Sequence, residues 1–253
     1  MKEGRRRIAT PRGAMLADPA GLGSWLDTVG ETLFEPGFWS ARGGAAAASL
    51  GRGAAWFIDT GTERWVLRHY RRGGTLTRLL GDWFAWLGED RVRSFHEFRL
   101  LEGLFGQGLP VPMPIAARYL RSGPIYRCDL IMQCIADSTP LSTLLAAGAI
   151  GEDRWRAVGA TIARLHLAHV DHADLNAHNI LIGSGGQVSV VDFDRGRVRA
   201  RAGARSAARP AWAERNLKRL HRSLVKISRG WPADRFCGAA WHSLMAGYAS
   251  FGG

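Results

Sequence analysis

The fold is decided by His172-Ala173-Asp174-Leu175-Asn176-Ala177-His178-Asn179-Ile180-Leu181-Ile182, a polar loop that runs straight into a short apolar strand. A second apolar run, Val188-Ser189-Val190-Val191, follows after Gly183-Ser184-Gly185-Gly186 and continues into Asp192-Phe193-Asp194. A glycine-rich tetrapeptide between two apolar runs is typical of a turn, so we predict a β-hairpin. Its polar flanks carry the residues that could do chemistry.

The predicted hairpin would bring Asn179 and Asp192 to one end of the strand pair. Amide and carboxylate oxygens are ligands that Mg²⁺ prefers, and the ion leaves its other positions to water and phosphate. We therefore interpret Asn179 and Asp192 as metal ligands. Asp174 lies one loop away, where it could accept a proton from a hydroxyl group, and it is the candidate catalytic residue.

The remaining sequence predicts two lobes of different composition, with a cleft between them. Residues 1–40 are expected to be irregular or partly helical. Strands are predicted near residues 56–58, 63–70, 115–120 and 126–135, and helices at 95–107, 141–145, 153–169 and from 212 onward. The predicted class is therefore α+β, with a smaller β-rich lobe over residues 1–135 and a larger α-rich lobe over residues 136–253.

The spacing H-x-D-x-x-x-x-N, followed by a strand and D-F-x, resembles the catalytic loop and metal-binding aspartate of the protein-kinase-like fold. The resemblance implies that Asp174 orients and deprotonates the attacking hydroxyl. It also implies that Asn179 and Asp192 hold Mg²⁺ on the phosphates of ATP. His172 would support the loop.

Upstream residues fit further parts of that fold. Gly51 and Gly53 fit the glycine loop over the phosphates, a weak signal taken alone because such glycines often mark a simple turn. Arg68 stands where the fold carries a lysine, which keeps the charge but changes its geometry. Glu97 would be its acidic partner, with Glu102 as the weaker candidate. The backbone of the stretch that contains Gln133 and Ile135 would bind adenine.

Two departures from the protein-kinase pattern narrow the substrate. Asp194 replaces the glycine that normally follows D-F, and no A-P-E triplet follows in the sequence after Arg195-Gly196-Arg197. The segment that binds a peptide substrate is therefore missing from the pattern. These departures favour a kinase of a sugar or another small molecule.

A closer resemblance rests on four stretches. They are His172 to Ile182, Asp192-Phe-Asp-Arg-Gly, Gly51-Arg-Gly-Ala-Ala-Trp-Phe-Ile and Val66-Leu-Arg-His-Tyr-Arg-Arg-Gly-Gly. Together they are similar to the 3-deoxy-D-manno-octulosonic acid (Kdo) kinases of Gram-negative bacteria, relatives of the lipopolysaccharide core heptose kinases, over about residues 35–250. That family carries the R-H-Y-x-R-G-G stretch as such, so Arg68 fits it. The resemblance implies ATP-dependent phosphorylation of the 4-hydroxyl of Kdo on a lipid A precursor.

The charge of the chain agrees with an anionic partner. The formal net charge is +12 and the pI is near 10.8, which favours phosphates, carboxylates or an anionic membrane. A basic amphipathic helix is predicted from Arg215, Arg219, Arg222 and Lys226 opposite Leu217, Leu220, Leu224 and Ile227. No apolar run reaches the roughly 18 residues of a membrane span and no signal peptide is recognisable, so we expect a cytoplasmic protein. The resemblance implies a lipid A acceptor at the anionic inner leaflet, and with the basic helix it leads us to expect peripheral binding to the cytoplasmic face of the inner membrane.

Other interpretations remain open. One segment is crowded with His166, His169, His172, Asp174 and His178, and imidazole and carboxylate groups can bind the Zn²⁺ of a metal hydrolase. A nucleic-acid-binding protein would explain the high pI, but no zinc-finger, RNP or helix-turn-helix pattern occurs, so we expect no nucleic-acid partner and see no sign of an obligate protein partner. An inactive kinase relative is disfavoured because all three catalytic-site residues are present. Heptose and aminoglycoside-type kinases share those three residues, so the acceptor depends on the family resemblance.

Overall fold

The computed structural model describes residues 5–23, 25, 29–50, 53–72, 81–200, 209–232 and 235–251. Contacts within the chain divide it into two compact units. The first comprises residues 1–103 and 112–134, and the second comprises residues 104–111 and 135–253. The boundary that we predicted after residue 135 lies one residue beyond the end of the first unit, and the second unit also includes the short segment 104–111.

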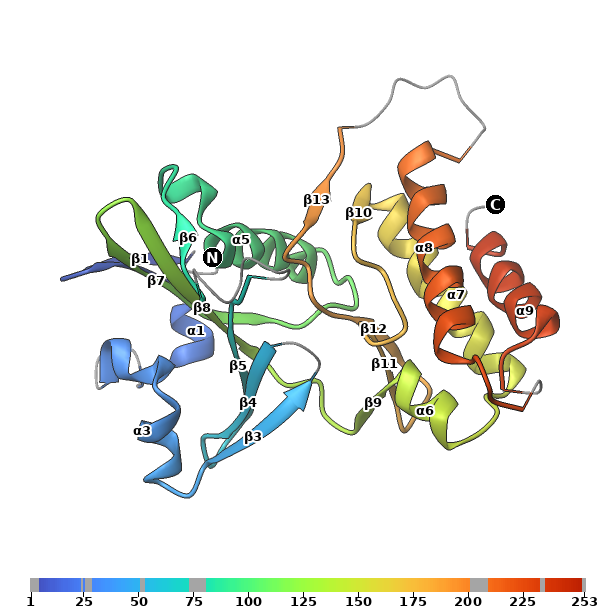
Figure 1. The fold of residues 1–253 in the computed structure, drawn as a ribbon, viewed down its shortest axis with the longest axis horizontal. Helices are drawn as coiled ribbons and strands as arrows, with labels where there is room; N and C mark the ends of the chain where they lie inside the picture. The colour runs from blue at the N-terminus through green and yellow to red at the C-terminus, as the bar shows by residue number, and fades with distance from the viewer. Residues whose placement is uncertain are drawn as a thin grey trace. The chain divides into compact units, whose positions relative to one another are not determined.

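The first unit is built on an antiparallel sheet (Figure 1). Its strands are β1 (Arg6–Thr10), β2 (Gly13–Ala17), β3 (Ala45–Leu50), β4 (Gly53–Asp59), β5 (Arg64–His69), β6 (Phe84–Ala85), β7 (Pro114–Ser122) and β8 (Ile125–Gln133). Their order is β1-β2-β7-β8-β5-β4-β3, with β6 paired to β8 beside this path. Consecutive strands can pair through short turns only when they are antiparallel, which explains the hairpins β1–β2, β3–β4, β4–β5 and β7–β8.

The first 40 residues contain regular structure that the sequence analysis did not predict. β1 and β2 form a hairpin at the edge of the sheet, and β2 pairs with β7 from Gly13↔Leu120 to Ala17↔Ala116. β1 is largely exposed, whereas residues 14–17 of β2 are buried. The expectation of an irregular or partly helical lead-in is wrong for β1 and β2, because pairing with a distant strand determines their structure. Its helical part is confirmed further along by three short helical segments among the described residues between Pro19 and Ser40.

Helical segments cover the sheet of the first unit. They are α1 (Pro19–Leu22), the 3-10 helix η1 (Gly30–Phe34), α3 (Pro36–Ser40), the 3-10 helix η2 (Glu89–Arg91) and α5 (Arg93–Gly106). Helix α5 buries an apolar stripe that includes Phe95, Phe98 and Leu101. It continues to Leu104, whereas Phe105 is 37% exposed.

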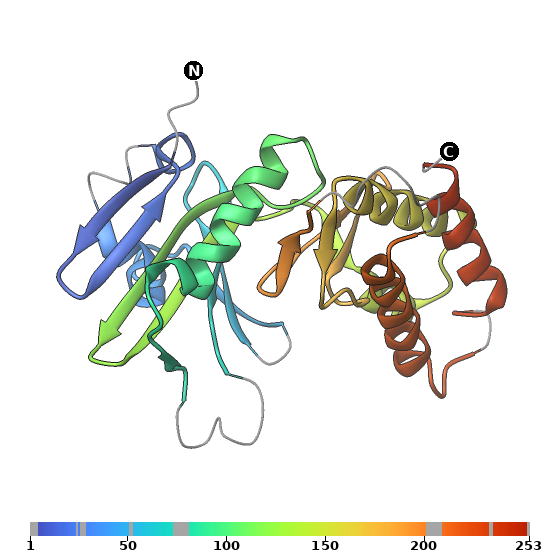
Figure 2. The same cartoon turned by 90° about the horizontal axis from the view of Figure 1, so that it is seen from above.

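The two faces of β5 carry different chemistry. Trp65 and Leu67 are buried in an apolar cluster with Trp39 of α3, and the rings of Trp39 and Trp65 are 5.8 Å apart in an edge-to-face arrangement. Side chains alternate along a strand, so Arg68 lies on the opposite face. That is the face along which α5 runs in Figure 2. The strand thus presents a cation to the helix while anchoring itself in the core.

The second unit combines helices with short strands. Its helices are α6 (Leu141–Ala147), α7 (Glu152–Leu167), α8 (Ala211–Ile227) and α9 (Gly238–Ala249), and its strands are β9 (Ser138–Pro140), β10 (Val170–His172), β11 (Ile180–Gly183), β12 (Val188–Val190) and β13 (Gly196–Val198). β11 lies between β9 and β12, and β10 pairs with β13. A β-rich unit and a helix-rich unit confirm the predicted α+β class.

Two glycines allow α7 and α9 to pack closely. A Cβ atom on Gly159 of α7 would collide with the backbone oxygen of Leu244, and one on Gly247 of α9 would collide with that of Arg156. Any larger residue at either position would therefore push the helices apart. No helix among the described residues is both long enough and apolar enough to cross a bilayer.

Candidate active site

The polar loop of residues 173–179 connects β10 to β11, and the register of the following hairpin determines its end. Ile180 pairs with Val190, and the backbone N–H of Val191 donates to the carbonyl oxygen of Asn179 at 2.9 Å. Asn179 and Asp192 therefore emerge from the same end of the strand pair, as the sequence predicted. The backbone geometry brings the two proposed metal ligands together.

Asn179 is held so that its amide oxygen remains available. Its Nδ2 donates to the carbonyl oxygen of Asp174 at 3.1 Å, which orients the amide, and the residue is only 8% exposed. No described residue donates to its Oδ1. Asp192 has φ +65°, a left-handed conformation that aspartate tolerates better than most residues and that costs about 1–3 kcal/mol. Two hard oxygen donors on one strand end fit Mg²⁺.

Asp174 has a described hydrogen-bond partner at one of its two carboxylate oxygens. Its side chain is 37% exposed. Oδ1 accepts a hydrogen bond from Nη2 of Arg219 on α8, and no described residue donates to Oδ2. A hydroxyl group at Oδ2 would find a proton acceptor there. The arrangement fits the general-base role predicted for Asp174.

Helix α8 anchors the catalytic loop through two further polar side chains. Oδ1 of Asn216 accepts from the backbone N–H of His172 at 3.0 Å, and Oγ of Ser223 accepts from the N–H of Ala177 at 3.3 Å. The sequence analysis missed Asn216 and Ser223. A signal existed for Asn216, because it interrupts an apolar helix face that includes Ala213, Leu217 and Leu220.

Asp171 secures the start of the loop. Its carboxylate is 3% exposed, and it accepts from Nδ2 of Asn216 at 2.9 Å and from Nη2 of Arg199 at 2.6 Å. Burial alone would raise the pKa of Asp171, but these hydrogen bonds and the charges of Arg199 and Arg197 outweigh it and lower the pKa. The ionised carboxylate ties β10 to both α8 and the segment after β13.

His172 joins the loop to the segment that carries Asp192. Its Nε2 donates to the carbonyl oxygen of Val191 at 3.0 Å, and its ring lies 4.6 Å from that of Phe193. Burial lowers the pKa of His172, so the ring is neutral, with its proton on Nε2 because a carbonyl can only accept. Its buried Nδ1 has no partner among the described residues. The contacts give His172 the supporting role that the resemblance implied.

In the first unit, Arg68 and Glu97 form the predicted ion pair. Nη2 and Nη1 of Arg68 lie 2.8 and 3.2 Å from the two carboxylate oxygens of Glu97, which is fully buried. Tyr70 donates to Oε2 of Glu97 at 2.5 Å, and the Arg68 guanidinium lies over its ring. Glu102, the weaker candidate, pairs instead with Arg5. The bidentate geometry explains why arginine suits this strand position.

His69 belongs to a second charged network beside that pair. Its Nδ1 and Nε2 each lie 2.6 Å from a carboxylate oxygen, of Asp129 and Asp82 respectively. Asp129 also accepts from Nε of Arg118 at 2.7 Å. Burial would lower the pKa of His69, but its two carboxylate partners outweigh this and raise it. The stretch Arg68-His69-Tyr70 thus satisfies three buried or half-buried carboxylates.

Removing the Arg68 guanidinium is expected to destabilise the first unit. The substitution Arg68→Ala should lower the free energy of unfolding by about 3–5 kcal/mol, because it strands the fully buried Glu97 carboxylate without its cation. Urea unfolding measures this loss. Arg68→Lys keeps the charge and should lose less, and Glu97→Gln added to Arg68→Ala should recover part of the loss. Identical midpoints for Arg68→Ala and the unchanged chain would contradict a stabilising role.

The other predicted nucleotide contacts stay predictions. Gly51 lies outside the described residues, and Gly53 begins β4 opposite Leu50. The N–H of Gln133 donates to the carbonyl oxygen of Met113 at 2.8 Å, and the carbonyl oxygen of Ile135 accepts from Oγ of Ser138 at 2.7 Å. One backbone group of each adenine-binding candidate is therefore already engaged.

A family profile matches most of the chain. The profile describes the lipopolysaccharide kinase (Kdo/WaaP) family and matches residues 37–248. The chain belongs to this family. The resemblance read from the motifs is thereby confirmed, and with it the expectation of a phosphotransferase that acts on a hydroxyl group.

Individual members of the Kdo/WaaP family are similar over most of their length. A protein named 3-deoxy-D-manno-octulosonic acid kinase from Xanthomonas euvesicatoria is 46% identical over 196 residues, which cover 78% of this chain and 75% of that protein. Proteins of the same name from Stenotrophomonas maltophilia and Xylella fastidiosa are 46% and 44% identical over 195 residues, which cover 77% of this chain and 75% of each relative.

His166, one of the histidines that suggested a zinc hydrolase, packs inside the second unit. His166 is 9% exposed, and its Nδ1 lies 2.9 Å from the hydroxyl of Tyr248. Its ring packs edge-on against Trp212. Across the described ranges, no group of three or more His, Cys, Asp or Glu side chains is arranged to hold a metal ion. The hydrolase interpretation therefore has no support from the geometry.

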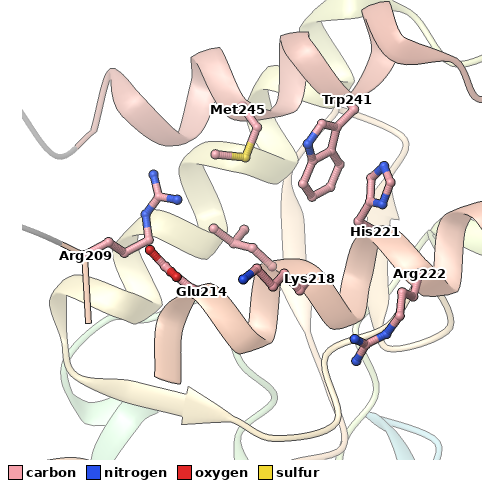
Figure 3. A pocket seen from close by; sticks show the side chains of 8 residues that line it. Arg209, Glu214, Lys218, His221, Arg222, Trp241 and Met245 are labelled. Carbon is pink, nitrogen blue, oxygen red and sulfur yellow. The ribbon is translucent and has the colours of Figure 1, made fainter. Parts of the chain in front are cut away.

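Helix α8 uses its apolar stripe inside the second unit. Leu217, Leu220 and Leu224 are buried, and a cavity of about 620 Å³ between α8 and α9 is lined by Leu217, Trp241 and Met245 among others. Figure 3 shows Trp241 and Met245 of α9 projecting toward α8, with the ring of His221 against Trp241. The exposed face of α8 is basic. The buried apolar stripe therefore cannot contact a membrane, and only the exposed basic face of α8 could do so.

Acid is expected to destabilise the second unit between about pH 6.5 and 4. Burial lowers the pKa of His166 to about 4, so the unfolded chain binds a proton there before the folded one does. Stability is full above the ordinary pKa of about 6.5 and falls as the pH drops toward 4, by up to about 3 kcal/mol from His166 alone. Urea unfolding at stepped pH values should show this slope, and His166→Gln should flatten it. An equal slope in both proteins would refute the assignment.

Proposed function

We propose that this chain transfers the γ-phosphoryl group of ATP to the 4-hydroxyl of Kdo attached to a lipid A precursor. Membership of the Kdo/WaaP family and the named relatives support a kinase of Kdo in lipopolysaccharide biosynthesis. The observation that carries the proposal is the catalytic loop, where Oδ2 of Asp174 accepts from no described residue and lies in the same loop as Asn179, beside the strand end that also bears Asp192. The attachment of Kdo to lipid and the choice of hydroxyl belong to the proposal.

The reaction can be written on these residues. The acceptor hydroxyl gives its proton to Oδ2 of Asp174, and its oxygen forms a bond to the γ-phosphorus. The bond from that phosphorus to the bridging oxygen breaks, and ADP leaves with the electron pair. Phosphoryl transfer of this kind depends mainly on positioning and on neutralising charge. Asn179 and Asp192 would hold Mg²⁺, which neutralises phosphate charge when bound.

The deciding experiment is a comparison of acceptors. Purified protein would be incubated with [γ-³²P]ATP and, in parallel, a Kdo-bearing lipid A precursor, a heptose-bearing core and a protein substrate. The label is expected on the Kdo acceptor alone, and NMR of the product should place the phosphate on O4. Label on heptose alone would reassign the acceptor within the same family. Label on none of the three would refute the proposal.

We propose further that the protein binds the cytoplasmic face of the inner membrane peripherally. The exposed basic face of α8 supports this, because it adjoins the catalytic loop through Arg219 and includes Arg215, Arg222 and Lys226, all exposed. An anionic surface attracts such residues by about 1 kcal/mol each. The same attraction would bring a membrane-embedded acceptor to Asp174.

Charge removal from α8 should weaken vesicle binding. Replacing Arg215, Arg222 and Lys226 with alanine is expected to lower partitioning onto phosphatidylglycerol-containing vesicles about 100-fold, the product of three such contributions. Co-sedimentation measures the partitioning. The matched control removes three exposed arginines elsewhere, Arg91, Arg154 and Arg156, and should bind much as the unchanged protein does. Equal losses in both triple variants, or equal binding to neutral vesicles, would argue against a specific membrane face.

A further inference from the structure

Three polar residues of α8 face the catalytic loop, and one of them contacts a side chain of the loop, whereas the other two contact its backbone. Asn216 and Ser223 hydrogen-bond to backbone groups of the loop, at His172 and Ala177, so they hold its shape. Arg219 instead contacts the side chain of Asp174. Its own side chain is 46% exposed, whereas Asn216 is 3% exposed. A half-exposed cation thus lies against the carboxylate proposed to accept the proton.

The Arg219 guanidinium has donors to spare at this point. It carries five N–H groups in a planar fork, and Nη2 donates to Oδ1 of Asp174. No other acceptor for the fork lies among the described residues. Oδ2 of Asp174 has no described donor either. A hydroxyl bound at Oδ2 would therefore have unused guanidinium N–H groups beside it, which suits an acceptor that carries an anion close to the reacting hydroxyl.

We propose that Arg219 binds the carboxylate of a sugar-acid acceptor and thereby presents a nearby hydroxyl to Asp174. The proposal rests on the proposed function and deepens it. In 3-deoxy-octulosonic acid the carboxylate is attached to C2 and the 4-hydroxyl to C4, so a single ring carbon separates the two positions. Asp174 could therefore contact the 4-hydroxyl while Arg219 contacts the carboxylate of the same molecule. A neutral sugar offers the guanidinium only hydroxyl oxygens and no anionic group, and hydrogen bonds to a carboxylate are stronger, so Arg219 makes the site selective for an acid.

A purely structural role explains the pair less well. An ion pair between two side chains that are this exposed contributes little to folding stability, and Asn216 and Ser223 already attach the loop to α8. Arginine provides a planar fork that matches a carboxylate. The position of that fork beside the reacting group is what a substrate-binding role requires.

The test crosses a change in the protein with a change in the acceptor. Initial rates would be measured for the unchanged protein and Arg219→Gln, each with a Kdo acceptor and with the same acceptor carrying a carboxamide in place of the carboxylate. The unchanged protein should lose about 10- to 100-fold in kcat/KM on the carboxamide, the range for hydrogen bonds to a charged group. On the carboxylate acceptor, kcat/KM of Arg219→Gln should fall below that of the unchanged protein by a similar factor. On the carboxamide acceptor, the two proteins should have nearly the same kcat/KM. KM for ATP should not change.

The control is Arg156→Gln on α7, which removes a 50% exposed, ion-paired arginine from the same unit and should match the unchanged protein on both acceptors. Equal losses by Arg219→Gln on the two acceptors would overturn the proposal, because Arg219 would then act through Asp174 alone. So would equal rates of the unchanged protein on the two acceptors. Failure of the unchanged protein to phosphorylate either acceptor would instead refute the proposed function, and this inference with it. Should Arg219→Gln not fold, Arg219→Lys keeps the charge without the fork and carries the same comparison.

Discussion

The substitution Asp174→Ala is expected to lower kcat at least about 10²-fold, the scale of a general-base contribution. The loop should keep its shape, because Asn176 and Asn179 hydrogen-bond to the backbone carbonyl of Asp174 and not to its side chain. Binding of ATP should therefore persist while transfer stops. Initial rates with a Kdo acceptor, together with a separate measurement of nucleotide affinity, distinguish the two effects.

The control for this prediction is Asp153→Ala. Asp153 is an exposed carboxylate in the first turn of α7 in the same unit. Its replacement therefore removes the same charge at a position outside the catalytic loop. It should leave the rate unchanged. Near-normal turnover by Asp174→Ala, or a loss of nucleotide affinity as large as the loss of rate, would defeat the assignment of Asp174 as the proton acceptor.

The second large effect is expected at Asp192, whose replacement should abolish the use of Mg-ATP. Asp192→Asn is the sharper variant, because asparagine accepts the left-handed backbone of this position, whereas alanine would add strain. The loss of the carboxylate charge should weaken Mg-ATP binding and reduce turnover below detection. Titration of a fluorescent ATP analogue with and without Mg²⁺ shows whether the metal-dependent part of the affinity has gone.

The neighbouring Asp194→Asn provides the comparison for Asp192. It makes the same chemical change two residues further along, at the position where protein kinases carry glycine, and no metal role is assigned to it. We expect metal-dependent ATP affinity to survive there. Equal effects of the two substitutions would show that the general negative charge of the segment matters, and not a specific ligand at Asp192.

Local sequence patterns predicted the elements whose partners lie close along the chain. The hairpin of β11 and β12 follows from two apolar runs and a glycine-rich turn, and it places Asn179 and Asp192 together because antiparallel neighbours must share an end. The partners in the Arg68–Glu97 pair are 29 positions apart, and this pair was predicted from the resemblance to the protein-kinase-like fold, in which a strand cation pairs with an acidic helix residue. Neither prediction required knowledge of packing in the rest of the molecule.

Distant contacts produced the features that the patterns missed. β1 and β2 are strands because β2 pairs with β7, about a hundred residues later, and β3 contains four alanines, which have low strand propensity. In α5, Leu104 is buried whereas its neighbour Phe105 is 37% exposed. In each case the tertiary environment outweighs local preference.

The amino-acid sequence by itself determined the family, the hairpin, and the three residues that we assign to proton transfer and metal binding. It could do so because their spacing along one short segment sets their geometry. Only the tertiary structure decided that α8 packs its apolar stripe inward and places Arg219 against Asp174, 45 positions earlier in the chain. Burial of leucines in the second unit sets the rotation of that helix, and the rotation brings the guanidinium to the carboxylate.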